Sequence, residues 1–263
     1  MDYVQHPIAG EYSVYLLQTI LPPSLAMTLL PTPTSQWTLG DAVGTPVVFE
    51  LGQQYNCGAR SLPFSKVSFG EAKLQIPYVR RRELKEGALD TTDAWVTYKK
   101  RIWMDNRLFA TSTPVMYGLS TQYCSRVGFG MEALDGQHYA DYIVRQGDEV
   151  PLLLFKRDVT PRFVRDTDAS YWEMLGKHDW IGDRTSTFAA HVFDWQGRQV
   201  EKVSGVIHLR LEAVEDAARA FGDAGFKVNR STRSEEETVE IPVDGILVQR
   251  LPHKMTRPQM TYW

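Results

Sequence analysis

The sequence predicts an α+β fold that is mostly β, with an antiparallel, barrel-like sheet and a few short helices. Segments rich in Val, Ile, Thr, Tyr, Phe and Trp recur along the chain between turn residues, which is typical of strands. These segments do not alternate regularly with helical ones, which argues against a doubly wound parallel sheet. Neither an internal repeat nor a shift in composition divides the chain, so residues 1–263 are expected to form a single domain.

The elements can be predicted in order along the chain. Residues 21–33 form a short helix between prolines, with Ser24 as its N-cap and Pro31 as its end. Residues 211–226, rich in Ala and charged side chains, form the clearest helix, and residues 170–177 form a shorter one. The predicted strands cover residues 45–51, 66–79, 93–105, 138–146, 150–157, 185–195, 200–212 and 238–251.

The composition narrows the classes of partner and cofactor. The chain has a net charge of −3 and no basic stripe, which argues against nucleic acid as a partner. It has no apolar run of membrane-spanning length and no basic and apolar leader, so we expect a cytoplasmic protein without membrane contact. Its two cysteines and six histidines lack the spacing of metal ligands, so we expect neither a metal nor another cofactor.

Two adjacent lysines, Lys99 and Lys100, lie within the predicted strand 93–105. A lysine that is desolvated, or crowded by a second cation, loses its proton easily and can form a Schiff base with a carbonyl. In a regular strand the two side chains point to opposite faces, which places Lys100 on the apolar face with Tyr98 and Ile102, and Lys99 on the mixed face. Lys100 is then either a residue whose amine extends to water or an amine of lowered pKa.

His191 is the histidine of most interest. It shares one strand face with Ala189, Phe193 and Trp195, which predicts partial burial. Two interpretations remain open, a satisfied core histidine or an acid or base at the wall of a pocket.

Three segments resemble acetoacetate decarboxylase and its relatives. Residues 11–33 (EYSVYLLQTILPPSLAMTLLPTP) are similar to the family's opening strand, short helix and Leu-Leu-Pro-x-Pro ending. Residues 69–79 (FGEAKLQIPYV) and 103–122 (WMDNRLFATSTPVMYGLSTQ) are similar in order and spacing to its glutamate-bearing strand and its Asp-Asn segment. The resemblance covers roughly the first half of the chain. It implies a cone-like β-barrel that encloses a pocket, often in an oligomer, so a homo-oligomer is one expectation.

Carried over residue by residue, the resemblance is uneven. The family's glutamate is retained at Glu71, and the aromatic residue of its aromatic-Gly element is retained at Tyr117. The family's two lysines fall on Thr121 and Gln122, neither of which can form an imine. Its N-terminal arginine falls on Gly10, which argues against the family's way of holding a substrate carboxylate.

The resemblance therefore implies an enzyme without a Schiff-base lysine, acting on a small, largely apolar keto or polyketide-like metabolite. Glu71 would act as the acid or base, while Thr121 and Gln122 polarise a carbonyl or stabilise an enolate. The reaction would be a cyclisation, pericyclic ring closure included, a dehydration or an isomerisation in secondary metabolism. The residues expected to bind the small-molecule substrate are Tyr117, Met116, Trp103, His191 and Lys100.

Two alternatives stay open. In the first, the protein is a Schiff-base lyase in which Lys100, on a different strand, has taken over the role of the amine. In the second, it is a non-catalytic protein that carries an apolar ligand in its pocket.

Overall fold

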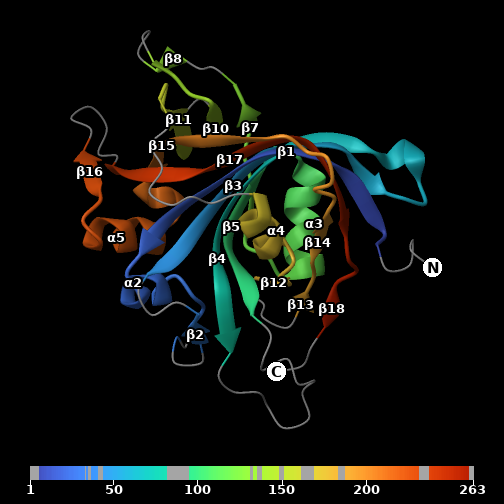
Figure 1. The fold of residues 1–263 in the computed structure, drawn as a ribbon, viewed down its shortest axis with the longest axis horizontal. Coiled ribbons are helices and arrows are strands. Elements are labelled where there is room, and N and C mark those ends of the chain that lie inside the picture. Colours follow the sequence, from blue (N-terminus) through green and yellow to red (C-terminus); the bar gives the residue numbers. More distant parts are fainter. Residues whose placement is uncertain are drawn as a thin grey trace.

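The computed structural model describes residues 6–32, 34, 37–40, 44–81, 95–130, 133–134, 138–147, 151–160, 169–182, 187–230 and 237–260. In these ranges no helix has both the length and the apolar character that a membrane span requires. Strands dominate, and a few short helices lie against them (Figure 1).

Within the described residues, 14 strands pair into one sheet that curls like part of a barrel (Figure 1). Hydrogen-bonded neighbours follow the order β12-β5-β4-β3-β1-β17-β15-β11-β10-β7. The pairs are antiparallel, apart from β12 and β6, which each run parallel to β5. The predicted mostly β, antiparallel class is therefore confirmed. The strands of this sheet are β1 (Ile8–Leu21), β2 (Trp37–Leu39), β3 (Thr45–Ala59), β4 (Val67–Arg81), β5 (Val96–Met104), β6 (Thr121–Tyr123), β7 (Arg126–Phe129), β10 (Tyr142–Arg145), β11 (Leu153–Arg157), β12 (Trp180–Ile181), β14 (His191–Phe193), β15 (Val200–Arg210), β16 (Lys227–Arg230) and β17 (Glu237–Met255).

Short elements complete the described fold. Two small strand pairs join β8 (Ala133–Leu134) to β9 (His138–Tyr139) and β13 (Thr187–Phe188) to β18 (Gln259–Met260). The helices are α2 (Pro23–Met27), α3 (Arg107–Tyr117), α4 (Ala169–Gly176) and α5 (Glu215–Asp223), with 3-10 turns at Pro63–Ser65 and Leu211–Ala213.

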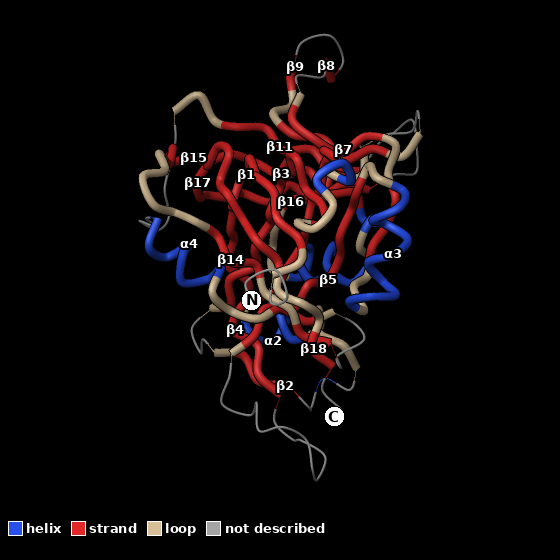
Figure 2. Tube along the Cα trace, turned by 90° about the vertical axis from the view of Figure 1, so that its right-hand side faces the viewer, coloured by secondary structure: helices blue, strands red, loops and turns tan. Residues whose placement is uncertain are grey.

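The two faces of the curled sheet have different neighbours. Phe49 of β3 and Leu74 of β4 point into the main apolar core, which Ala26 of α2 and Phe221 of α5 complete. Because successive side chains of a strand alternate, their neighbours point to the opposite face. Figure 2 shows α3 and α4 on either side of β5 and β14, where they cover this second face. Its polar residues on β3 and β4 are Glu50, Gln54, Glu71, Lys73 and Gln75.

Several predicted elements differ in detail from the structure. The predicted helix 21–33 is shorter, and Pro22 rather than Ser24 occupies its N-cap position. A proline at the start of a helix lacks only an N–H that would have no partner there. Pro22 can therefore take the N-cap position that was predicted for Ser24. The predicted helix 211–226 is confirmed as a 3-10 turn followed by α5. The predicted helix at 170–177 is confirmed as α4.

Helix α3 has no counterpart in the sequence-based prediction. Its sequence, RLFATSTPVMY, carries three Ser or Thr residues and the internal Pro114, all of which have low helix propensity. Two terminal signals favour the helix nevertheless. Asn106 Oδ1 accepts a hydrogen bond from the Phe109 backbone N–H at 3.1 Å, and Gly118 adopts a left-handed conformation, with φ of 65°, at the C-terminal end.

Strand β5 contains an extra residue that changes which side chains face which way. Lys99 pairs with Gln75, whereas Arg101 pairs with Leu74. Between these two pairs β5 therefore contains one residue more than β4, which makes a β-bulge. Before the irregularity the odd-numbered side chains point to the second face, and after it Ile102 does so. Lys99 therefore lies on the polar second face and Lys100 on the side of α5, which are opposite faces as predicted. Beyond the irregularity the predicted faces of Ile102 and Trp103 are reversed.

Candidate functional site

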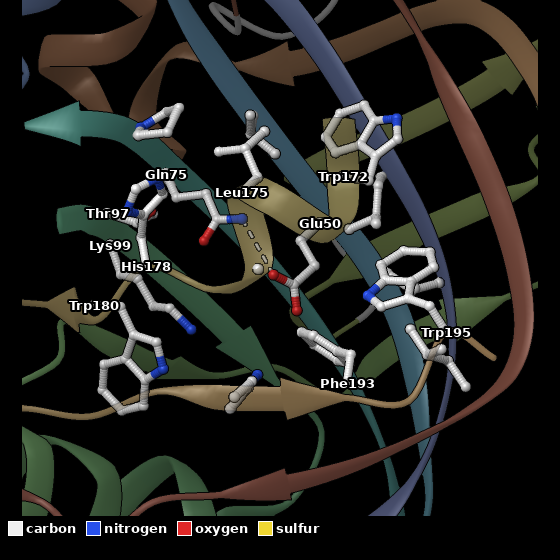
Figure 3. Close-up of a pocket in the computed structure, with 17 residues that line it drawn as sticks. Glu50, Gln75, Thr97, Lys99, Trp172, Leu175, His178, Trp180, Phe193 and Trp195 are labelled. Atoms are coloured by element: carbon white, nitrogen blue, oxygen red, sulfur yellow. Dashed lines mark hydrogen bonds between the residues drawn. The ribbon is translucent and has the colours of Figure 1, made fainter. Parts of the chain in front are cut away.

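Two cavities meet at Lys99, on the face of the sheet that α3 and α4 cover. The larger has a volume of about 360 Å³ and lies between α3 and strands β3, β4 and β5. The smaller has a volume of about 60 Å³ and lies between α4, β14 and the same strands. Lys99, Trp180 and His191 line both cavities and so form their junction. Figure 3 shows the Lys99 amine directed between Trp180 and Glu50 in the smaller cavity.

A buried cluster of charged side chains lies beside this junction. Lys73 Nζ lies 2.5 Å from Glu50 Oε1 and 2.7 Å from Glu71 Oε2, so one ammonium bridges two carboxylates. Gln75 Nε2 donates a hydrogen bond to Glu50 Oε2 at 3.1 Å, and Gln54 Nε2 donates one to Glu71 Oε2 at 3.2 Å. Glu50 lines the smaller cavity and Glu71 lines the larger one, so the cluster presents a carboxylate to each.

The bridging contacts keep Glu50 and Lys73 charged. Burial raises the pKa of Glu50, but the attraction of Lys73 and Lys99 outweighs burial and lowers it to about 2. Burial lowers the pKa of Lys73, but the attraction of Glu50 and Glu71 outweighs burial and raises it above its ordinary value. The Lys73 amine is therefore protonated, and it has no free lone pair with which to attack a carbonyl.

Lys99 has the opposite electrostatic surroundings. It is 3% exposed, and its Nζ lies 4.4 Å from the centroid of the Trp180 ring, with no carboxylate paired to it among the described residues. Burial lowers the pKa of Lys99, the positive charge of Lys73 lowers it further, and the opposing attraction of Glu50 and Glu71 leaves it at about 7. A large fraction of this amine is therefore neutral and nucleophilic at neutral pH.

Two buried histidines lie next to the cluster, with their ring centroids 5.5 Å apart. Burial lowers the pKa of His191 well below its ordinary value, and the charges of Lys99 and Lys73 add to this effect. Burial and the charge of Lys73 lower the pKa of His253 to about 4, against the attraction of Glu50. Both imidazoles are therefore neutral at neutral pH, and each has one donor and one acceptor nitrogen.

Cys57 also lines the larger cavity, but it is not a thiolate. Burial and the negative charge of Glu71 raise its pKa to about 12, so the thiol keeps its proton at neutral pH. Over the part of the chain that the structure describes, no three His, Cys, Asp or Glu side chains gather as a metal site requires.

The Asp-Asn pair at 105–106 positions both the glutamate and a wall of the larger cavity. Asp105 Oδ1 accepts a hydrogen bond at 2.8 Å from the backbone N–H of Gly70, the residue that directly precedes Glu71 in the chain. The Tyr142 hydroxyl lies 2.9 Å from the backbone carbonyl oxygen of Glu71. Asn106 caps α3, which forms the outer wall. This segment therefore has a clear structural role in building the site.

Four of the residues predicted for the site line the larger cavity. Glu71 and His191 lie at its polar end, near Lys99. Met116 and Tyr117 lie on α3, and the Tyr117 ring packs against Trp180 with centroids 5.4 Å apart. The structure thus brings these four together with Lys99, and their roles in catalysis or binding stay predictions.

Lys100 and Trp103, also predicted for the site, line neither cavity. Lys100 is the extra residue of β5, and its Nζ pairs with Asp216 Oδ2 of α5 at 3.3 Å. Trp103 follows the irregularity and points into the main apolar core, where it is fully buried. Trp103 points away from the cavities because it follows the irregularity, whereas Lys100 lies on the side of α5, and the binding roles predicted for both stay predictions.

Thr121 and Gln122 do not line these cavities either. Both lie on the short strand β6, beyond β5 in the sheet. The Thr121 hydroxyl donates to the Leu119 carbonyl oxygen at 3.4 Å, and Gln122 Nε2 donates to the exposed Gln146 Oε1 at 2.7 Å. These side chains therefore lie outside the two cavities that Glu71 and Lys99 line, and their contact with a substrate carbonyl stays a prediction.

Sequence reasoning missed three charged residues of the site: Glu50, Lys73 and Lys99. A signal for one of them, Lys73, was available. Glu71, Lys73 and Gln75 occupy every second position of one predicted strand, which gives that strand a polar face. The other face of the strand is apolar. Because both of its faces are buried, a polar face of this kind indicates a site rather than solvent contact.

Comparison with solved structures bears on the fold. No family model matches this sequence, and no curated protein matches it. An acetoacetate decarboxylase-like enzyme from Sphingomonas wittichii RW1 superposes with a TM-score of 0.51 at 13% identity, over 97% of this chain and 94% of that one. The acetoacetate decarboxylase of Legionella pneumophila gives a TM-score of 0.44 at 10% identity, over 98% and 89% of the two chains. The enduracididine biosynthesis enzyme MppR gives 0.46 at 12% identity, over 93% and 87%.

The chain therefore has the acetoacetate decarboxylase-like fold. The predicted resemblance is confirmed at this level, and it extends beyond the first half of the chain from which it was read.

Proposed function

We propose that this protein is a lyase that acts on a small, largely apolar ketone or aldehyde through a Schiff base on Lys99. The observation that carries the proposal is the position of Lys99. It is a buried amine with a pKa of about 7, at the junction of two cavities. A desolvated lysine next to a second cation is the usual arrangement for an amine that attacks carbonyls.

The first step would proceed as follows. The lone pair of Lys99 Nζ attacks the carbonyl carbon, the C=O π electrons move to oxygen, and the oxygen gains a proton. Loss of water from this carbinolamine then forms a protonated imine. The imine withdraws electrons from the neighbouring bond, so either a proton or a carbon substituent can leave the α-carbon as an enamine forms.

Proton transfer in these steps needs a group within reach of the substrate. Glu71 and the neutral His191 both line the larger cavity with Lys99 and supply such groups. This retains the acid or base role predicted for Glu71. The proposal for Lys99 differs from the predicted lysine-independent reaction, and it differs from the alternative in which Lys100 is the amine.

A ketone and borohydride test this proposal. Incubation with acetone and sodium borohydride is expected to reduce the imine and leave one isopropyl group on Lys99, located by peptide mass spectrometry. Lys99→Met should remove the label. Lys100→Met is the matched control, because it removes the adjacent lysine that pairs with Asp216, and labelling at Lys99 should persist. Equal labelling of Lys99→Met and the unaltered protein would contradict the proposal.

The pH dependence of trapping gives a second test. Only the neutral amine attacks, so the rate should rise as pH increases through the folded pKa of about 7 and then level off. A solvent-exposed lysine would still gain reactivity up to about pH 10. The rate of labelling with cyanoborohydride as reductant can be measured from about pH 5 to about pH 10. A rate at Lys99 that continues to climb above about pH 9 would show that the amine is not perturbed as proposed.

A further inference from the structure

We propose that the substrate of Lys99 is an uncharged carbonyl compound with two unequal arms, a short one and a longer apolar one. The proposal rests on the Schiff base proposed above and adds the class of substrate. It is carried by the charge balance of the buried cluster and by the shapes of the two cavities.

The charge balance favours a neutral substrate. Glu50 and Glu71 carry two negative charges, and Lys73 bridges them with one positive charge. With Lys99 neutral, the cluster therefore has an excess of one negative charge. Formation of a protonated imine adds one positive charge and makes the buried site neutral. A substrate carboxylate would restore the excess, in surroundings where an unpaired charge is costly.

The described lining of the cavities offers no guanidinium and no second ammonium to hold a carboxylate. It contains no arginine and no lysine besides Lys99. Lys73 lines neither cavity, and both of its carboxylate partners lie within 2.7 Å. His191 is neutral because of its strongly lowered pKa. A keto acid would therefore lose its hydration without gaining an ion pair.

The unequal volumes of the cavities predict unequal arms. The smaller cavity, of about 60 Å³, has room for a small group, whereas the larger, of about 360 Å³, has room for a chain of several carbons. Phe69, Phe109 and Met104 line the larger cavity, which suits a hydrocarbon arm. Leu108 and Met116 both line it and are 73% and 51% exposed, so the cavity reaches the surface through an apolar rim.

Competitive reductive trapping tests the charge of the substrate. Levulinate and methyl levulinate share the same keto-acyl skeleton and differ in the charge of the carboxyl and in one ester methyl group, and N-acetyl-lysine in solution corrects for their intrinsic reactivity. Labelling of Lys99 by the ester is expected to exceed labelling by the acid at least about tenfold, which corresponds to about 1.4 kcal/mol. Equal labelling, or stronger labelling by the acid, would overturn the proposal that the substrate is uncharged.

A cavity-filling variant tests the longer arm. Ser112 is a small residue of α3 that lines the larger cavity, and Ser112→Phe should fill part of it. Labelling by methyl nonyl ketone is expected to fall at least about tenfold more than labelling by acetone. Thr111→Phe is the matched control, because Thr111 is exposed on the same helix and does not line the cavity. An equal loss with both ketones would overturn the two-armed substrate.

These outcomes are distinct from failure of the proposed function. If no carbonyl compound labels Lys99, acetone included, the Schiff base itself is refuted. If acetone labels Lys99 while the ester and the acid react equally, the Schiff base stands and the inference about substrate charge fails.

Discussion

Lys73→Met is expected to lower the free energy of unfolding by about 3–5 kcal/mol. The Lys73 side chain is 1% exposed and bridges Glu50 and Glu71. Its removal leaves two buried carboxylates without their shared cation, and the repulsion between them adds to the cost of burial. Urea denaturation monitored by tryptophan fluorescence measures the change, with Lys100→Met as a control. The control removes a partly exposed ion pair and should cost less than about 1 kcal/mol.

A triple variant checks the physical cause of this loss. Replacing Lys73 by Met and both Glu50 and Glu71 by Gln removes the cation together with the charges that need it. This variant should recover part of the stability lost in Lys73→Met, because neutral groups cost less to bury than unpaired carboxylates. If Lys73→Met is as stable as the unaltered protein, the cluster is not the buried ion-pair network described above.

Lys99→Met is expected to have the opposite effect and to stabilise the fold. Lys99 has a pKa of about 7 in the folded protein, whereas an unfolded lysine has a pKa of about 10.4. Below pH 7 the amine is charged in both states, and the folded protein bears the full cost of burying the charge. Methionine removes this cost, which is on the order of 1.4 kcal/mol for each unit by which the pKa is lowered.

The gain should depend on pH in a defined direction. Between about pH 7 and about pH 10.4 the unfolded state binds the proton that the folded state has lost, so the unaltered protein becomes more stable as pH rises. The advantage of Lys99→Met should therefore be largest below pH 7 and shrink toward pH 10. Denaturation of both proteins at several pH values measures the difference. An advantage that grows with pH would contradict the lowered pKa of Lys99.

Lys73→Met is expected to lower the free energy of unfolding and Lys99→Met to raise it, because only Lys73 is paired with carboxylates among the described residues. Both lysines are almost fully buried on the same face of the sheet. Lys73 is paired and contributes to stability. Lys99 has no paired carboxylate among the described residues, and its burial is expected to reduce stability. A group that is kept reactive commonly has this effect, which agrees with the role proposed for Lys99.

Much of the fold could be predicted from the sequence because local patterns determine it. The long strands β3, β4 and β17 combine β-branched residues with alternation of buried side chains, and these signals do not depend on distant parts of the chain. Helix α3 was missed because its interior residues oppose helix formation, while its capping by Asn106 and its burial against β5 favour it.

The site could be predicted only in part. Of the residues that the resemblance singled out, Glu71, Met116 and Tyr117 line the larger cavity, whereas Thr121 and Gln122 do not. Lys99 was not predicted for the site, because alternation along β5 separates it from Lys100 but does not show which face of the strand borders a cavity. The pairing of Glu50 with Lys73 depends on the register between β3 and β4, which one strand's sequence does not contain.

The extra residue in β5 also has a consequence for sequence comparison. Aligning this chain with a relative whose strand is regular requires a gap of one position within residues 99–101. Without that gap, Ile102 and Met104, which line the larger cavity, are matched to residues of the relative's core. Residues that line a cavity in one protein would then be compared with residues that pack in the core of the other. A lysine shifted by one position along the strand would be counted as a substitution, although an equivalent lysine is present. Relatives of this protein are better sought by aligning its two halves of β5 separately.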